Sequence, residues 1–274
     1  VKGGLLLCAK QGMLTEGQKL YNKAVETFSG NQSALSDLAL IAVIHPELVR
    51  DVSIPIGWID AQHELGPGYI DLGNSEALQL TEAITIEGWF WAKSNGDLLR
   101  KGGSYLDDGY GLRLRNEAIR FELQNTQTQD QSITDVPLPE DREWFHFAAT
   151  WEMKTSEIII YVDGARQDQV GYFNGPIGVS DQHLNLGRNE RWFNRYCNVA
   201  FSEVRIWNRV RTGEEVRAAM NTRLKGNEPG LAGYWPFDKD TGITAQGGLE
   251  ANGVDGIIIN PNWQATDSLP FSDD

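Results

Sequence analysis

Cysteine and basic residues are both scarce in this chain of 274 residues. Its two cysteines, Cys8 and Cys197, are too few for a disulfide framework and do not have the spacing of zinc ligands. The 24 Lys and Arg residues are outnumbered by 38 Asp and Glu residues, which gives a net charge of -14. A surface that binds nucleic acid needs a basic footprint. The composition therefore excludes non-specific binding to nucleic acid or to anionic lipid.

Long apolar runs are also missing. The longest, Leu5–Leu7 and Leu38–Ile44, are far shorter than the roughly 20 residues of a membrane-spanning helix, so we expect no membrane span. Apolar residues still make up 41% of the chain, enough for a packed core. The sequence opens with Val1 instead of Met, which leaves open a processed form, or a piece of a longer chain or larger assembly.

Residues 1–50 have a helical pattern. Thr15 and Gln18 have the spacing of a capping box, apolar residues at helical spacing follow it, and Pro46 stops a second periodic segment. We therefore predict a short N-terminal α-helical hairpin over residues 1–50. It is either one unit of a helical-repeat array or a simple packing or oligomerisation hairpin.

Residues 51–274 have the pattern of a β domain. In Thr85–Trp91, apolar residues alternate with Glu and Trp, so both faces of this strand are expected to be covered, as in a two-layer sandwich. Asp163-Gly164 between two apolar-rich segments predicts a two-residue hairpin turn. Thr212 and Glu215 form another capping box and predict one peripheral C-terminal helix. Strands are expected at residues 85–91, 110–114, 118–123, 145–151, 157–162, 184–186, 199–207 and 231–237. The fold class is mainly β, a two-sheet antiparallel sandwich.

Six segments occur in an order typical of a known family. They are Tyr69–Gly73, Ile84–Trp89, Glu143–Trp151, Ile160–Gly164, Leu184–Asn189 and Ser202–Arg209. Together, over residues 54 to 265, they resemble the laminin G-like and pentraxin-like domains of the concanavalin A-like lectin/glucanase superfamily. The resemblance implies a β-jellyroll over residues 51–274. It also implies binding of glycans or proteins on the concave face or rim loops, often with calcium. By family habit the location would be extracellular or at a cell surface, with the cytoplasm left open.

Catalytic carboxyl pairs are not evident in the sequence. A glycosidase needs two carboxyl groups about 5 to 10 Å apart across a cleft, and the glucanases of the superfamily carry three acids in one short strand. Glu203 stands alone between Ser202 and Val204, and no nucleophile motif surrounds any of the four histidines. His146 matches the family pattern at a position where a core or hydrogen-bonding role is usual. We predict no catalytic residue and a non-enzymatic domain, with a glycan-degrading enzyme as a minor alternative.

Calcium is the cofactor that the resemblance implies. Its candidate ligands here are Asp60, Asp238 and Asp240, since Ca²⁺ prefers several carboxylate and carbonyl oxygens. The family's acidic turn is largely replaced in this sequence, and a serine, Ser202, stands where relatives commonly carry an acid. Solvated surface acids are therefore the alternative to a structural calcium site.

The most suggestive binding segment is residues 188–196. Exposed aromatic rings beside arginine and amide groups suit both sugar rings and protein partners. The candidate ligand-binding residues are Arg188, Asn189, Arg191, Trp192, Phe193 and Tyr196. The alternative is that Trp192 and Phe193 only pack over the end of the sandwich. Residues 105–110, with Arg113 and Arg115, are further candidates to complete the site.

Apart from the minor enzymatic alternative, the sequence favours two functions. The first is a lectin-like recognition domain that binds a glycan or protein ligand through rim loops. The second is a structural module that docks onto protein neighbours in a larger complex.

Overall fold

The computed structural model describes residues 68–102, 107–139, 144–189, 195–237, 244–245 and 255–259. The predicted N-terminal hairpin, residues 1–50, lies outside the described residues. The described elements are β1 (Tyr69–Asp71), η2 (Glu76–Leu78), β2 (Ala83–Ala92), β3 (Gly96–Gly102), β4 (Gly109–Arg115), β5 (Ala118–Asn125), β6 (Asp130–Pro137), β7 (Phe145–Glu152), β8 (Glu157–Val162), β9 (Ala165–Tyr172), β10 (Leu184–Leu186), β11 (Val199–Trp207), α4 (Gly213–Ala219), β12 (Leu231–Trp235), β13 (Thr244–Ala245) and β14 (Gly256–Ile259).

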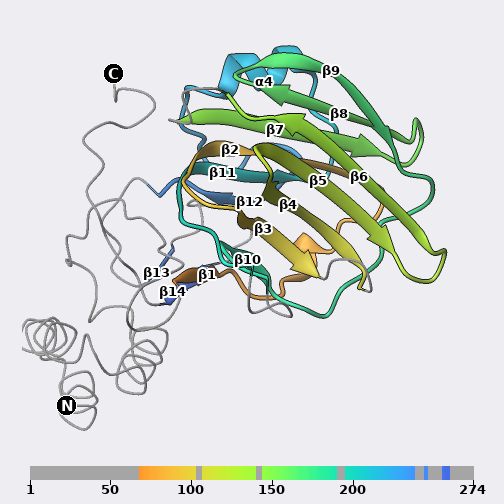
Figure 1. Ribbon diagram of the computed structural model, residues 1–274, viewed down its shortest axis with the longest axis horizontal. Coiled ribbons are helices and arrows are strands. Elements are labelled where there is room, and N and C mark those ends of the chain that lie inside the picture. Colours follow the sequence, from red (N-terminus) through yellow and green to blue (C-terminus); the bar gives the residue numbers. More distant parts are fainter. Residues whose placement is uncertain are drawn as a thin grey trace, which may run out of the picture.

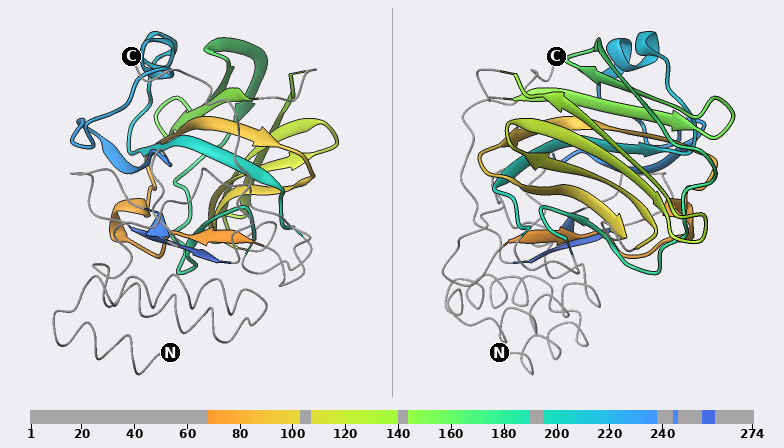
Figure 2. Two further views of the ribbon diagram at one scale, coloured as in Figure 1. Left: turned by 90° about the vertical axis from the view of Figure 1, so that its left-hand side faces the viewer. Right: turned by 45° about the vertical axis from the view of Figure 1, so that its right-hand side comes forward.

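The strands form two antiparallel sheets. One contains eight strands in the order β13-β14-β1-β10-β3-β4-β5-β6, and the other contains six in the order β12-β11-β2-β7-β8-β9. Figures 1 and 2 show the two sheets stacked face to face, each built of curved strands. The predicted two-sheet antiparallel sandwich is confirmed.

The core lies between the sheets. In β2, Ile84, Ile86 and Phe90 point into it and are fully buried, whereas Thr85 and Glu87 point the other way and are fully buried too. Both faces of this central strand are therefore covered, as the alternation of large residues predicts.

Two hairpins turn through a pair of residues with positive φ. Asp163 (φ 49°) and Gly164 (φ 72°) join β8 to β9, which confirms the predicted turn. The Asp163 side chain also accepts a hydrogen bond from the His146 backbone N–H at 2.8 Å. Asn116 (φ 50°) and Glu117 (φ 65°) join β4 to β5 in the same way, although neither residue is a glycine.

The predicted C-terminal helix is α4, which packs on the outer face of the six-stranded sheet (Figure 2). Its capping box is present: Glu215 N–H donates to Thr212 Oγ1 at 3.2 Å, and Thr212 N–H donates to Glu215 Oε2 at 2.8 Å. Val216 is its buried residue and packs against Ala148 and Tyr161 of the sheet. Among the described residues, no helix has both the length and the apolar character needed to cross a bilayer.

Candidate functional site

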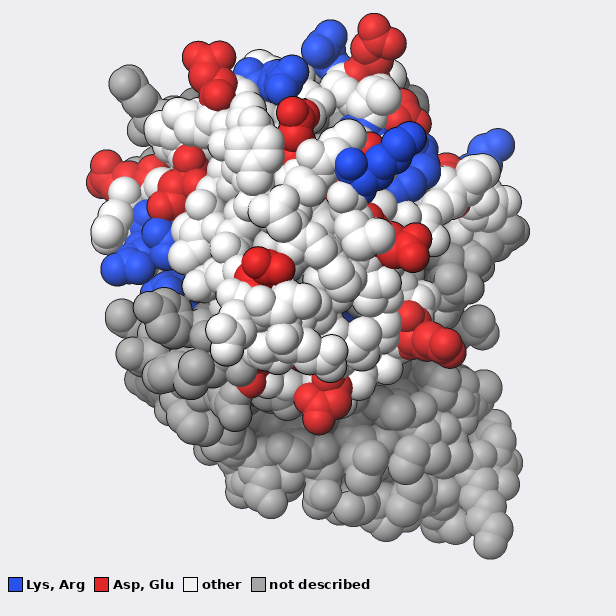
Figure 3. All heavy atoms as spheres, turned by 90° about the vertical axis from the view of Figure 1, so that its right-hand side faces the viewer, with Lys and Arg blue, Asp and Glu red and all other residues white. Residues whose placement is uncertain are grey.

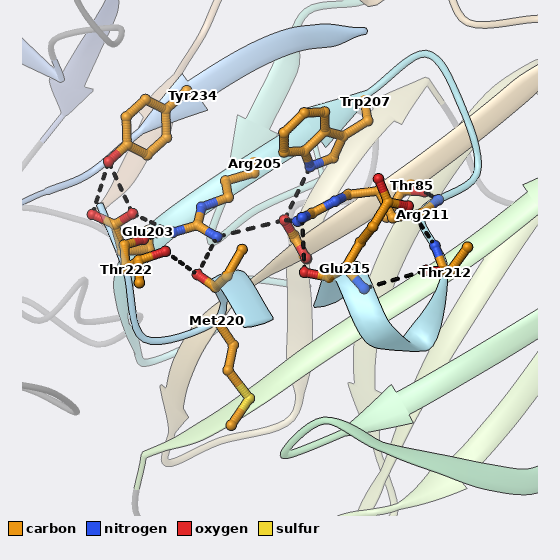
Figure 4. A network of polar contacts seen from close by, with 12 residues as sticks. Thr85, Glu203, Arg205, Trp207, Arg211, Thr212, Glu215, Met220, Thr222 and Tyr234 are labelled. Atoms are coloured by element: carbon orange, nitrogen blue, oxygen red, sulfur yellow. Dashed lines mark hydrogen bonds and ion pairs between the residues drawn. The ribbon is translucent and has the colours of Figure 1, made fainter. Parts of the chain in front are cut away.

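A buried ionic network fills the space between the six-stranded sheet and the segment that carries α4 (Figure 4). Arg205 lies between two carboxylates: its guanidinium is 2.6 Å from Glu203 and 3.6 Å from Glu87. The same Glu87 oxygen accepts from Trp207 Nε1 at 3.0 Å and from the Arg211 guanidinium. Glu203 is the only acid in its own strand, and it shares Arg205 with Glu87 of the neighbouring strand β2.

The local backbone explains how Glu203 reaches this network. The register between β11 and β2 shifts between Ser202 and Arg205, and Glu203 has a positive φ of 53°. Such a bulge re-aims a side chain, and the Glu203 carboxylate accepts from the Tyr234 hydroxyl at 2.9 Å. Glu87 and Glu203 are 0% and 1% exposed. Two buried carboxylates held by one arginine attach the helical segment to the sheet and offer a substrate no access.

His146 lies in the same layer. It is 1% exposed and packs edge-on against the Trp89 ring, with 5.5 Å between ring centroids. Burial, with the nearby Arg205 and Arg211 charges, lowers the pKa of His146 to about 3. The predicted core role is confirmed.

A polar pocket lies at the end of the sandwich where β2 and β4 finish. Its cavity volume is about 390 Å³, and its lining includes Lys93, Ser94, Asn95, Leu114, Asn116 and Glu117. Asn116 and Glu117 are the two positive-φ turn residues. Left-handed backbone at non-glycine residues is uncommon and concentrates at functional sites. This pocket is a concave polar site that the sequence did not reveal.

Segment 195–198, which continues the predicted binding segment, lies against this pocket. Lys93 N–H donates to the Asn198 carbonyl and Asn198 N–H to Ser94 Oγ, both at 2.8 Å. A Cβ at Gly96 would lie 2.3 Å from the Tyr196 carbonyl oxygen, so only glycine permits this approach. The described C-terminal part of the predicted binding segment, residues 195–196, and the pocket therefore share one end of the sandwich.

An arginine stacked on a tyrosine lies beside this segment. The Arg188 guanidinium carbon lies 3.4 Å from the centroid of the Tyr69 ring, and the Tyr69 and Tyr196 rings are 6.4 Å apart. Arg188 Nε donates to Asn185 Oδ1 at 2.8 Å, which fixes the guanidinium over the ring. All three clustered side chains are only partly buried. We call Tyr69, Arg188 and Tyr196 the aromatic cluster.

The other predicted site residues have different positions. Asn189 is 1% exposed, and Arg191, Trp192 and Phe193 lie outside the described residues. Asp60, Asp238 and Asp240 lie outside them too, so the calcium site stays a prediction. Within the described ranges, no group of three or more His, Cys, Asp or Glu side chains could hold a metal ion.

One suggested completion of the site is wrong. Residues 107–110 lie at the opposite end of β4: the Asp108 side chain accepts from the Thr126 backbone N–H, and the Tyr110 hydroxyl donates to the Leu78 carbonyl. Arg113 and Arg115 do lie at the pocket end, because they flank Leu114.

The opposite end of the sandwich shows a wide uncharged surface with scattered acids and with Lys and Arg at its margins (Figure 3). Exposed Val179 belongs to the loop that precedes β10.

Comparisons with known proteins agree with this architecture. The sequence model of the concanavalin A-like lectin/glucanases superfamily matches residues 66–217. The human adhesion G-protein coupled receptor D1 is 27% identical over 157 residues, which are 52% of this chain and 17% of the receptor. The chain thus spans about a sixth of the curated relative that it matches.

A solved structure has the same fold. A candidate carbohydrate-binding protein from Bacteroides ovatus superposes with a TM-score of 0.58 at 20% identity, over 79% of this chain and 61% of that one. A pentraxin from Limulus polyphemus gives a TM-score of 0.46 at 13% identity, over 75% of this chain and 95% of that one.

Proposed function

The chain belongs to the concanavalin A-like lectin/glucanase superfamily, and we propose that it is a non-catalytic recognition domain that binds carbohydrate at the pocket end of the sandwich. The observation that carries the proposal is the meeting of two features at segment 195–198: the polar pocket beside Ser94 and the aromatic cluster. Sugars present apolar ring faces edged by hydroxyl groups. A polar cavity next to tyrosines and a guanidinium matches both surfaces.

Described carboxylates support the non-catalytic part of the proposal. Glu87 and Glu203 are both bound by buried Arg205, and Asp97 and Glu122 are both bound by buried Arg100, at 2.8 and 2.7 Å. A general acid needs access to the glycosidic oxygen, whereas these four carboxylates are buried and bound to arginine. Hydrolysis of any polysaccharide that is lost in Glu122→Gln would overturn this part.

The test of the binding function is a glycan array followed by calorimetry. We expect Tyr196→Ala to weaken glycan binding by about tenfold or more, because truncation of a central aromatic anchor costs over 1 kcal/mol. Tyr172→Ala is the matched control, since Tyr172 is 60% exposed on β9. Trp192→Ala tests the part of the predicted site outside the described residues. The absence of glycan binding, or equal losses in Tyr196→Ala and Tyr172→Ala, would refute the proposal.

A second candidate is docking onto a protein neighbour. It is favoured by β9, the edge strand of the six-stranded sheet, where Val170 and Tyr172 are exposed apolar residues. Edge strands with unpaired backbone groups can accept a further strand. Sedimentation of the wild type and of Val170→Lys over a range of concentrations tests the simplest partner, a second copy. Association that Val170→Lys does not change would argue against β9 as the docking edge.

Calcium and compartment remain proposals. If Asp60, Asp238 and Asp240 hold a structural Ca²⁺, a concentration of about 100 times Kd should stabilise the fold by about 2.7 kcal/mol. An unchanged melting temperature after addition of calcium and then of chelator would contradict calcium binding.

We propose an extracellular or cell-surface location from the habit of the family, and detection of the native protein only in the cytosolic fraction would contradict it.

A further inference from the structure

Four charged residues lie side by side across the outer face of the eight-stranded sheet. Backbone register places Asp97 of β3 opposite Arg113 of β4, Arg113 opposite Arg120 of β5, and Arg120 opposite Asp135 of β6. The neighbouring residues Leu112, Leu114, Ile119 and Phe121 point into the core. Because side chains alternate along a strand, Arg113 and Arg120 point away from the core. We call these four residues the charged row.

The acids of this face are already bound by other arginines. Arg120 forms two hydrogen bonds with Asp135, at 2.7 and 2.8 Å. Arg100 binds Asp97 and Glu122 and reaches across Gly111, where a Cβ would lie 2.7 Å from the guanidinium. The missing side chain at position 111 therefore lets Arg100 lie flat on the sheet.

Arg113 differs from both of these arginines because, within the described part of the chain, no carboxylate lies within ion-pair distance of it. It is partly buried, and among the described residues its Nε has no hydrogen-bond partner although that atom is shielded from solvent. Burial lowers the pKa of Arg113. The Asp97 charge offsets this in part, and the Arg195 charge adds to the lowering. A partly buried guanidinium whose Nε has no partner, with a second arginine nearby, is a site of positive potential in a chain of net charge -14.

Arg113 is also next to the proposed sugar site. It precedes Leu114, which lines the polar pocket. Asp97 N–H, in the neighbouring strand, donates to the Arg195 carbonyl at 2.9 Å, and Asn198 N–H donates to Ser94 of the pocket. Segment 195–198 therefore contacts both the charged row and the pocket. A ligand held at this end can therefore place a substituent over β4.

We propose that Arg113 binds the carboxylate of an acidic sugar, so that the recognition domain selects glycans that contain uronic acid over their neutral counterparts. The inference rests on the proposed carbohydrate-binding function and adds the ligand class. The planar fork of donors on a guanidinium matches the two oxygens of a carboxylate.

The experiment compares each acidic oligosaccharide with its own methyl ester. Tetragalacturonate and hyaluronan tetrasaccharide serve as probes, since esterification removes the charge and keeps the sugar. Calorimetry should show that the wild type binds the acid at least about tenfold more tightly than the ester, the range expected for a hydrogen bond to a charged group. Arg113→Gln should remove this preference, because it weakens binding of the acid far more than binding of the ester.

Two further variants make the result specific. Arg166→Gln removes the same charge from an exposed position on β9 and should keep the preference. Arg113→Lys keeps the charge and loses the fork, and should retain only part of it. During titration of the wild type with tetragalacturonate, the chemical shift of the Arg113 Nε–Hε group should change. The backbone amide spectrum should remain that of the folded protein.

The outcomes separate the two proposals. If neither acid nor ester binds, and the array shows no glycan, the carbohydrate function itself fails. If neutral glycans bind but the wild type shows no preference for the acid, or if Arg113→Gln keeps that preference, the inference is overturned and the function stands. Tighter Arg113-dependent binding of a sulfated oligosaccharide or of a poly-glutamate peptide would also overturn it.

Discussion

Glu87 is the residue whose replacement tests the buried network most directly. Its side chain is 0% exposed, and one carboxylate oxygen contacts Trp207 Nε1, the Arg211 guanidinium and the Arg205 guanidinium. Glu87→Gln keeps the size of the side chain and removes the charge. Arg211 then stays buried without the Glu87 carboxylate, and Arg205 keeps Glu203 as its ion-pair partner.

The expected magnitude follows from this geometry. Removal of one partner from a buried ion pair costs about 3–5 kcal/mol because it leaves an uncompensated buried charge. Total unfolding free energies are about 5–15 kcal/mol, so Glu87→Gln should leave a marginal fold. For a domain of 150–250 residues, about 2–4 °C per kcal/mol corresponds to a fall in Tm of about 6–20 °C.

Urea denaturation followed by tryptophan fluorescence and by far-UV circular dichroism measures this loss. Glu157→Gln is the matched control, since Glu157 is an exposed glutamate on β8 of the same sheet, and it should change stability by less than about 0.5 kcal/mol. A loss below about 1 kcal/mol for Glu87→Gln would refute the reasoning that the network attaches the helical segment to the sheet. Replacement of both Glu87 and Arg211 by apolar residues should recover part of the loss.

Three further predictions concern other parts of the fold. Thr212→Ala should cost about 1 kcal/mol in urea denaturation through loss of the capping box with Glu215, and an unchanged midpoint would show that the cap is dispensable. Neutral His146 contributes stability that is fully present above its unfolded pKa near 6.5 and is lost as pH falls toward its folded pKa of about 3. The wild type should therefore lose about 2 kcal/mol between pH 6.5 and 5, and His146→Gln should flatten this slope; parallel pH profiles would contradict the assignment. Gly111→Ala should cost about 1–3 kcal/mol because the new methyl group displaces Arg100, and a fully stable variant with unchanged Arg100 resonances would count against that contact.

Strands with large residues on both faces were predictable from the sequence. The strands expected at residues 184–186 and 199–207 coincide with β10 and β11, and Asp163-Gly164 marked its turn. By contrast, β3 and β6 were missed. β3 carries Asp97, Arg100 and Lys101, and such a run of charges is typical of a loop. In the structure Arg100 pairs with Asp97 and with Glu122 of β5, and Lys101 donates to loop carbonyl groups. In β6 the buried positions include the polar residues Ser132 and Thr134. The sequence of this strand therefore does not alternate between apolar and polar residues.

The candidate site was only partly predictable. Arg188 and Tyr196 stand in one short segment rich in arginine and aromatic residues, so local composition indicated them. Tyr69, which stacks on Arg188, comes from a strand remote in sequence, and only the pairing of β1 with β10 brings it close. The position of Arg113 depends on the registers of three strands. No local pattern encodes such pairings.

The pairing of β1 with β14 determines how the domain responds to pulling on its flanking segments. Tyr69, at the start of β1, is the register partner of Ile259, at the end of β14, so chain that precedes the domain and chain that follows it leave from the same end of one ladder. Tension between these two attachments loads the hydrogen bonds of the ladder one after another, so they break singly and not all together. The contacts at this edge would therefore give way at low force, before the packed interior is disturbed.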